Sequence, residues 1–532
     1  MAPEAIDIDH VFADAGDGYL QKALALGGFE KNPLLLGQSM PDAAIADLAT
    51  SRLAATESFD VILVGLGHSE NAKLEWRKRK QAKPIMGQAP LSMRSLFSWA
   101  LSSPRYLSFV PPVMPTRAAL LFSAILMLAG TALRADSLTV AKDFEGASAA
   151  NVQIDNLART ISFTPGGDPR RGWPCWWYFR INGVTPGEKI ILHLRGSPAV
   201  TSTPGPLAKP LSPAWSMPAQ ATISTDGKNW VHTAKGVKEG SQMTYTITPD
   251  ATSVYVAWGP PYTPSTAAES FRQMAALSPY AHVEELCRSL EGRSVSMLHV
   301  MEGARPPAQR FGVWVQSRQH AWESGSSWVG QGFAEWLLGT DPEAAWLRQH
   351  AEVFIVPIMD VDNTATGNGG KDAIPHDHNR DWSAAPHWNE VAAAQKRVRG
   401  LIQEGRMDVF LDLHNPSADD PTFFFLVDPS AMKEPMISLC DRFTKLAYGR
   451  ISTAKPFIPM SNKPKTTGPA YHPLWKQISA CWVSMNGNPT TVSVCLETIW
   501  NAPNSTTEGY RIVGANLAAA VREYLADRPA PR

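Results

Sequence analysis

The sequence carries no net charge, because its 49 lysine and arginine residues balance 49 aspartate and glutamate residues. A neutral chain has no overall attraction to nucleic acid or to any other polyanion, so electrostatic steering has to come from local patches. Cysteine is scarce as well: the five cysteines are widely spaced and form no Cys-x-x-Cys pair. This scarcity excludes a full disulfide framework and argues against a cysteine-ligated metal site, so most of the cysteines are expected to be small buried residues.

Residues 114–135 have the layout of a secretory signal peptide, with Arg117 at the start, an apolar stretch at 118–130 and small residues before Asp136. The apolar stretch is too short to cross a bilayer comfortably, which takes about 20 residues. Either translation begins at Met114 and residues 1–113 are a mis-called extension, or the segment is an internal signal anchor. Both interpretations predict that the following residues are exported, to the periplasm or the extracellular space, or anchored with that side outside. The alternative is a buried core helix in a cytoplasmic protein.

The spacing of apolar, aromatic and turn residues divides the rest of the sequence into two expected domains. Residues 136–265 contain short alternating and aromatic strands separated by turn residues, which is typical of an antiparallel β-sandwich. In residues 266–527 strands alternate with helical segments, which predicts an α/β domain with a mixed, largely parallel sheet flanked by helices. Residues 1–113 show no recognisable chemistry and form an upstream segment of unknown role.

Polar side chains follow three predicted strands of the second domain, at residues 310–317, 408–413 and 491–496. His320 and Glu323 come shortly after the first strand, His414 directly after the second and Glu497 directly after the third. In an open α/β sheet, ligands bind beyond the carboxyl ends of the strands. The sequence therefore predicts that these four side chains meet at one edge of the sheet.

Two histidines and one carboxylate are a ligand set that catalytic zinc uses, with a fourth position left for water. We therefore predict one Zn²⁺ per chain, bound by His320, Glu323 and His414. A nearby carboxylate can take the proton of the metal-activated water, and Glu497 fits that role.

Several motifs around these residues resemble those of the zinc metallocarboxypeptidases, and the branch they resemble most is that of the cytosolic carboxypeptidases. The segment 319–329 is similar to the first zinc motif, 412–414 to the third-ligand motif and 496–498 to the strand that carries the catalytic glutamate. The segments 176–180 and 260–263 resemble parts of the sandwich domain that precedes the protease domain in that branch. The resemblance covers about residues 140–525 in the expected order and implies a peptide hydrolase that removes C-terminal residues.

The resemblance also implies how a substrate is bound. Asn379 and Arg380 match the Asn-Arg pair that grips the terminal carboxylate, and Tyr471 matches in rough position the mobile tyrosine over the substrate. The chain departs from the family where an arginine usually precedes the Asn-Arg pair, because residues 367–372 contain none. Lys371 is expected to replace it as a point charge, or stabilisation of the developing oxyanion is weaker.

Other interpretations stay open at this point. A peptide-binding pseudoenzyme would keep the fold without efficient chemistry, and a zinc amidohydrolase would act on cell-wall peptides or N-acyl amino acids. The expected partners are peptide or protein C-termini, with no nucleic acid and no stable protein partner. We expect His376, His378 and His387 to be surface loop residues without a special role.

A charge asymmetry suggests a substrate preference. Residues 442–496 contain no aspartate or glutamate, but they contain Arg442, Lys445, Arg450, Lys455, Lys463, Lys465 and Lys476. The stretch leads into Glu497, so part of it is expected to line the cleft and to favour acidic C-termini.

Overall fold

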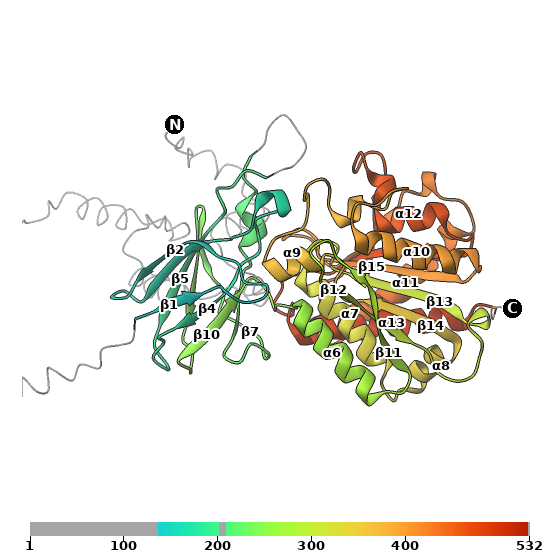
Figure 1. Cartoon of the computed structure of the whole chain (residues 1–532), viewed down its shortest axis with the longest axis horizontal. Coiled ribbons are helices and arrows are strands. Elements are labelled where there is room, and N and C mark those ends of the chain that lie inside the picture. Colours follow the sequence, from blue (N-terminus) through green and yellow to red (C-terminus); the bar gives the residue numbers. More distant parts are fainter. Residues whose placement is uncertain (1–136, 202–208, 530–532) are drawn as a thin grey trace, which may run out of the picture. The chain divides into compact units, whose positions relative to one another are not determined.

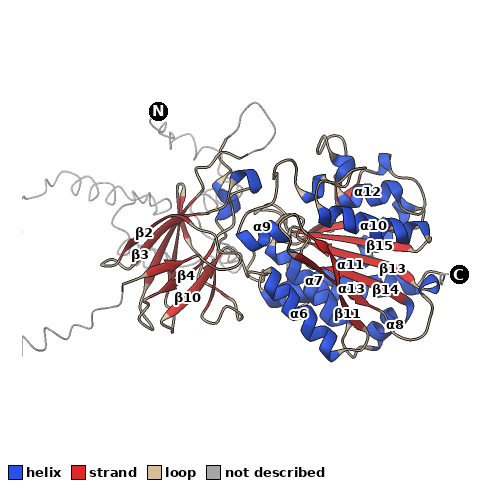
Figure 2. Cartoon of the chain, in the orientation of Figure 1, coloured by secondary structure: helices blue, strands red, loops and turns tan. Residues whose placement is uncertain are grey.

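The computed structural model describes residues 137–201 and 209–529. The interpretations of residues 1–113 and 114–135 concern parts of the chain outside these ranges. Within the described ranges, no helix has both the length and the apolar character needed to cross a bilayer. The described residues form a β-sandwich followed by an α/β domain, which confirms the predicted fold class (Figures 1 and 2).

The β-sandwich consists of two five-stranded sheets. The first has the order β1-β4-β10-β6-β7, with β1 (Thr139–Ala141), β4 (Tyr178–Asn182), β10 (Ser253–Ala257), β6 (Thr222–Ser224) and β7 (Val231–His232). The second has the order β2-β3-β5-β9-β8, with β2 (Ala150–Asp155), β3 (Thr160–Thr164), β5 (Ile190–Arg195), β9 (Gln242–Ile247) and β8 (Val237–Glu239). Alternate residues of β5, Ile190, Leu192 and Leu194, are fully buried, as expected for a strand with one face on a core.

The α/β domain is built on one eight-stranded sheet with the order β11-β12-β14-β13-β15-β18-β16-β17. The four central strands are parallel: β14 (Ala351–Val356), β13 (Phe311–Ser317), β15 (Met407–His414) and β18 (Val492–Glu497). The outer strands are β11 (Ala281–Arg288), β12 (Ser294–Val300), β16 (Phe423–Val427) and β17 (Lys465–Thr467). Every residue of β13, β14 and β15 is buried, because the parallel centre of the sheet is covered on both faces.

Helices cover this sheet (Figure 2). They are α6 (Pro264–Leu277), α7 (Ser324–Leu337), α8 (Pro342–His350), α9 (Val361–Thr366), α10 (Asn389–Gln403), α11 (Met436–Thr453), α12 (Ser479–Asn486) and α13 (Thr507–Ala526). Helix α13 packs against α7 and α11, while α10 and α12 both contact β15. The three strands predicted to carry the site appear as β13, β15 and β18, with ends within about two residues of the prediction.

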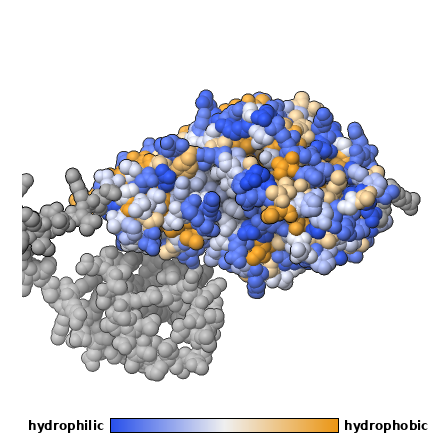
Figure 3. Space-filling model, turned by 60° about the horizontal axis from the view of Figure 1, so that its bottom comes forward, coloured by the Kyte–Doolittle hydropathy of each residue, from blue (hydrophilic) through white to orange (hydrophobic). Residues whose placement is uncertain are grey.

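Apolar side chains are concentrated inside the two domains, in one core centred on the sandwich and one on the eight-stranded sheet. On the face shown in Figure 3, hydrophobic residues are interspersed among hydrophilic ones. All five cysteines are free thiols and four of them are buried, so these four are the small core residues that the sequence predicted.

Candidate active site

The three central strands place four polar side chains at one edge of the sheet. His414 is the last residue of β15 and is paired in register with Glu497, the last residue of β18. His320 lies in the turn that follows β13, and Glu323 is the N-cap residue directly before α7. The backbone leaves β13 through Arg318 at a positive φ of 64°, and this turn brings His320 and Glu323 back over the strand ends.

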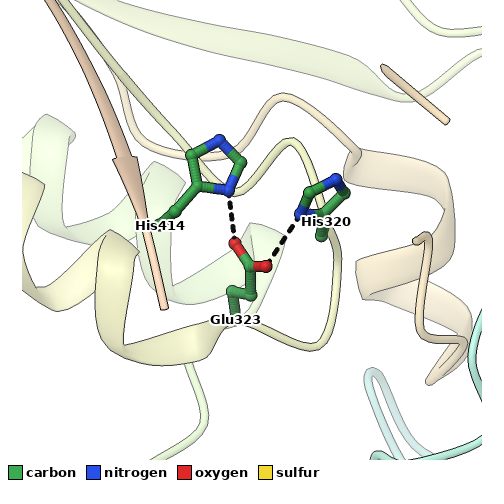
Figure 4. Close-up of side chains that lie close together, drawn as sticks. All are labelled: His320, Glu323 and His414. Carbon is green, nitrogen blue, oxygen red and sulfur yellow. Dashed lines mark hydrogen bonds and ion pairs between the residues drawn. The ribbon is translucent and has the colours of Figure 1, made fainter. Parts of the chain in front are cut away.

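His320, Glu323 and His414 converge on one point (Figure 4). Nδ1 of His320 lies 2.7 Å from Oε1 of Glu323, and Nδ1 of His414 lies 2.6 Å from Oε2 of the same carboxylate. Each of the three residues offers a ligand atom within 4.8 Å of the other two, and all three residues are buried.

The charges around Glu323 match a cation site. Burial opposes ionisation of Glu323, but the two facing imidazoles outweigh it and lower its pKa to about 2. Burial likewise opposes protonation of His414, but Asp412 and Glu323 raise its pKa well above the ordinary value. The pocket between these groups therefore favours a positive charge.

Each histidine also meets a carboxylate on the side away from Glu323. Nε2 of His414 lies 3.1 Å from Oδ2 of Asp412, and Nε2 of His320 lies 3.6 Å from Oδ1 of Asp377. This is the arrangement by which a metal-binding histidine is oriented through its second nitrogen. Two Nδ1 atoms and a carboxylate facing one point, backed by two carboxylates, fit a zinc ion with a position left for water.

Sequence reasoning assigned no role to Asp377 or Asp412. Asp412 is two residues before His414 on β15, so both side chains point to the same face, and this spacing is a signal that the sequence offered. Oδ2 of Asp412 also accepts hydrogen bonds from Gln319 Nε2 at 2.7 Å and from the Ser479 hydroxyl, which fixes the carboxylate. Asp377 precedes the Asn-Arg pair in a loop, where the sequence carries no comparable signal.

A cavity of about 480 Å³ opens above these ligands. All eight residues predicted for the site line it: His320, Glu323, Lys371, Asn379, Arg380, His414, Tyr471 and Glu497. Oε2 of Glu497 has no hydrogen-bond partner among the described residues, and burial raises the pKa of this carboxyl group to about 7. Glu497 is therefore placed at the cavity wall as a group that accepts a proton near neutral pH.

Asn379 and Arg380 lie in a short 3-10 turn, η6 (His378–Arg380), beside the ligand cluster. The Asn379 amide bridges two elements: its Oδ1 accepts from the Ser479 backbone N–H at 3.0 Å, and its Nδ2 lies 3.1 Å from His414 Nε2. The Arg380 guanidinium bonds to the Asn379 carbonyl, and its Nε has no partner among the described residues. Its centre lies 5.9 Å from the centroid of the Tyr471 ring, and Tyr471 is half-exposed.

Part of the stretch 442–496 lines the cavity, as predicted, but most of its cationic side chains do not. Of its seven cationic side chains, only Lys465 lines the cavity. Arg442 pairs with Asp527 and Arg450 with Glu523, each at 2.6 Å, and both acidic partners lie on or next to α13. Lys465 itself pairs with Asp420 at 2.7 Å. The preference for acidic termini stays a prediction, supported from this stretch only by Lys465.

The expectation that His378 is a surface residue is wrong, because it is buried between two buried carboxylates. Nδ1 of His378 lies 3.7 Å from Asp360 Oδ2, Nε2 lies 3.7 Å from Glu390 Oε2, and the ring stacks on Trp388. Its neighbour His376 is half-buried, and its Nε2 lies at hydrogen-bond distance, 2.6 Å, from Oδ1 of Asp381. The polar sequence around residues 376–381 looked exposed, but its charges pair with residues brought together by the fold.

The buried His378 predicts a pH dependence of stability. Burial alone would lower its pKa, but Asp360 and Glu390 outweigh burial and raise it to about 9, against 6.5 in an unfolded chain. The contribution of protonated His378 to the free energy of unfolding is therefore present in full below about pH 6.5 and is lost as the pH rises to about 9. His378→Gln should destabilise the protein by about 3–5 kcal/mol at pH 6.5, because two buried carboxylates lose their cation.

The measurement is the free energy of unfolding of wild type and variant at pH 6.5 and pH 9. The difference between the two proteins should shrink at the higher pH. An equal difference at both pH values would contradict a protonated His378, and His282→Gln, at an exposed position, is the control.

A twisted, largely parallel sheet with a buried metal-ligand cluster and an arginine at one cavity defines a metallocarboxypeptidase type of catalytic domain. Residues 268–414 match the zinc carboxypeptidase family, and residues 140–258 match the N-terminal domain of cytosolic carboxypeptidases. The chain therefore contains a zinc carboxypeptidase domain, preceded by the N-terminal domain found in cytosolic carboxypeptidases.

Two curated relatives match parts of the chain. Cytosolic carboxypeptidase 2 of Danio rerio is 26% identical over 275 residues, which cover 47% of this chain and 37% of that protein. An uncharacterized protein of Zymomonas mobilis is 27% identical over 244 residues, which cover 46% of this chain and 59% of that protein. The chain thus spans only about a third to three fifths of the length of these relatives.

Solved structures share the fold. A metallo-carboxypeptidase from Burkholderia cenocepacia superposes with a TM-score of 0.60 at 22% identity, covering 73% of this chain and 99% of that one. A metallo-carboxypeptidase from Pseudomonas aeruginosa, in complex with (2-guanidinoethylmercapto)succinic acid, gives a TM-score of 0.58 at 20% identity, with coverage of 73% and 99%. These likenesses extend over both the sandwich and the catalytic domain.

Proposed function

We propose that the protein is a zinc-dependent metallocarboxypeptidase that removes C-terminal residues from peptides or proteins. The observation that carries this proposal is the placement of Arg380 in the same cavity as His320, Glu323, His414 and Glu497. An enzyme that cuts within a chain has no need for a buried guanidinium next to its catalytic centre. A free terminal carboxylate, in contrast, is the group that a guanidinium matches with two parallel hydrogen bonds.

One Zn²⁺ per chain would be held by Nδ1 of His320, the carboxylate of Glu323 and Nδ1 of His414. When bound, zinc polarises a substrate carbonyl and lowers the pKa of a water molecule toward neutrality. Asp412 lies at hydrogen-bond distance from Nε2 of His414, and Asp377 faces Nε2 of His320 at 3.6 Å, so both carboxylates favour ring orientations that present Nδ1 to the ion.

Glu497 acts as the general base and then as the general acid. It takes the proton of the attacking water, and the water oxygen bonds to the carbonyl carbon of the last peptide bond. The C–N bond then breaks, and Glu497 passes the proton to the departing amine. Its place opposite His414 across the paired strand ends supports this role.

Arg380 and Asn379 select the substrate end. The planar guanidinium matches the two oxygens of a terminal carboxylate, and the Asn379 amide is held beside it by Ser479. Lys371, in place of the family's arginine, is the cation that faces the carbonyl oxygen as negative charge develops on it.

A pair of matched peptides tests this assignment. Wild type should release the last residue of a peptide with a free C-terminus and leave its C-terminally amidated twin intact. Arg380→Ala should lower kcat/KM for the free peptide by about 10²-fold or more, because a buried charge-assisted bidentate contact is lost. Arg442→Ala, which removes an arginine outside the cavity, is the control.

Equal cleavage of both peptides by wild type would rule out the assignment as an exopeptidase. Metal binding without any release of amino acids would favour the peptide-binding pseudoenzyme. Release only from dipeptides or N-acyl amino acids would favour the amidohydrolase. Export of the catalytic part stays a prediction from residues 114–135, and the natural substrate is expected to be a peptide or protein C-terminus.

A further inference from the structure

Two tryptophans of the β-sandwich domain line the active-site cavity of the catalytic domain. Trp173 and Trp215 stand at its wall together with Lys371 and the metal-ligand residues. Their ring centroids are 4.8 Å apart, and Trp215 contacts Trp322, in the metal-ligand turn, at 5.7 Å. The sandwich therefore contributes side chains to the site, and what they do there rests on the function proposed above.

The backbone before Trp173 is hydrogen-bonded to the loop that carries Lys371. The Gly370 N–H donates to the Arg171 carbonyl at 2.9 Å, the Trp173 N–H to the Lys371 carbonyl at 3.0 Å, and the Ile374 N–H to the Arg170 carbonyl at 2.8 Å. The two backbones touch so closely that a Cβ at Gly172 would lie 2.2 Å from the Gly370 nitrogen. No side chain fits between the domains at this point.

The backbone adopts left-handed conformations on both sides of Lys371. The residue before it, Gly370, has φ 77°, and the residue after it, Asp372, has φ 58°. A non-glycine residue in the left-handed region persists when surrounding contacts hold it there. Asp372 is fixed from both sides: its N–H donates to Asp377 Oδ2 at 3.1 Å, and its Oδ2 accepts from the Trp173 indole at 3.0 Å.

Trp173 also contacts the charged end of Lys371. The Lys371 Nζ lies 5.4 Å from the centroid of the Trp173 ring, within the range of a cation–π contact. A lysine side chain is flexible and has no fixed fork like that of arginine, so it depends on neighbours for its direction. Three contacts set the direction of the Lys371 side chain. They are the face of the Trp173 ring, the hydrogen bond from the Trp173 indole to Asp372, and the backbone hydrogen bonds between the two segments.

We propose that the segment 170–173 of the β-sandwich domain is part of the catalytic site, and that Trp173 is a positioning residue that holds the Lys371 ammonium group toward the scissile carbonyl oxygen. A lysine can then replace the family's arginine because a second domain supplies the rigidity that the guanidinium would bring. The sandwich acts in catalysis through Lys371 and does not bind the metal.

The test is a double-mutant cycle on the full chain, with Trp173→Ala, Lys371→Met and the double variant. Trp173→Ala should lower kcat about 10- to 100-fold with KM nearly unchanged, because a positioned donor acts on the transition state. In the double variant the loss should equal that of Lys371→Met alone. Losses that multiply in the double variant would overturn the proposal.

Two further variants separate positioning from loss of structure. Trp173→Phe keeps an aromatic face but loses the bond to Asp372, and should lower kcat severalfold; if Trp173→Ala does not fold, the cycle is run with this variant. Trp230→Phe removes an indole from the same sandwich away from the cavity, where it packs on Tyr178 and Tyr255. An equal loss of kcat in Trp230→Phe would also overturn the proposal.

Hydrogen exchange gives a readout that does not depend on turnover. The backbone amides of residues 368–374 should exchange faster in Trp173→Ala than in wild type and should be unchanged in Trp230→Phe. Unchanged exchange in Trp173→Ala would reject the positioning role. A wild type that releases no amino acid from any free C-terminus would instead reject the proposed function, whatever the exchange shows.

Discussion

Replacement of Glu497 by glutamine should lower kcat by about 10²- to 10⁴-fold, the range that a positioned general base contributes. Glutamine has nearly the same size and shape, so the fold and the cavity should stay intact. Its amide cannot take a proton from water, and the strand end that places it opposite His414 is unchanged. The measurement is kcat on a short peptide with a free C-terminus, together with the zinc content of the purified variant.

Glu239→Gln is the matched control, since Glu239 is an exposed residue of β8 in the sandwich. Zinc content of Glu497→Gln should equal that of wild type, because the ligands are other residues. Turnover near the wild-type rate would exclude Glu497 as the base. Loss of zinc together with activity would show that Glu497 helps to bind the metal.

The central strands of the sheet and the four residues at their ends, the three expected metal ligands and Glu497, were predictable because each depends on the sequence pattern of a short segment. Short, mainly apolar runs indicated β13, β15 and β18. The meeting of the polar residues at their ends follows from the topology of a parallel sheet. The Asn-Arg pair had no such signal. Its assignment came from resemblance alone, and the structure places both residues at the cavity.

Contacts between distant segments could not be predicted in this way. The sequence around Trp173 contains no signal that its backbone is hydrogen-bonded to Lys371, about two hundred residues further along the chain. The same holds for Arg442 and Arg450 of α11, which form ion pairs with residues on or next to α13 and do not line the cavity. A run of like charge in a sequence shows which residues need partners, but only the fold shows where those partners are.

Loss of one metal ligand should have the largest effect of all. His414→Ala removes one of the three side chains that face the ion position, and a change in an outer partner alone typically costs 10- to 100-fold in metal affinity. We therefore expect His414→Ala to lower zinc affinity by more than 100-fold and to abolish measurable turnover. Asp412→Asn leaves all three ligands in place and should lower zinc affinity by about 10- to 100-fold.

The fold should survive the loss of zinc, because the ligands stand on or next to a sheet whose central strands are fully buried in an apolar core. Chelation of wild type should abolish turnover with little change in far-ultraviolet circular dichroism, and added Zn²⁺ should restore activity. His282→Ala, at an exposed position on β11, should retain both zinc and activity. Full zinc content and full activity in His414→Ala would show that the ligand set is wrong, whereas unfolding on chelation would show that the ion holds the domain together.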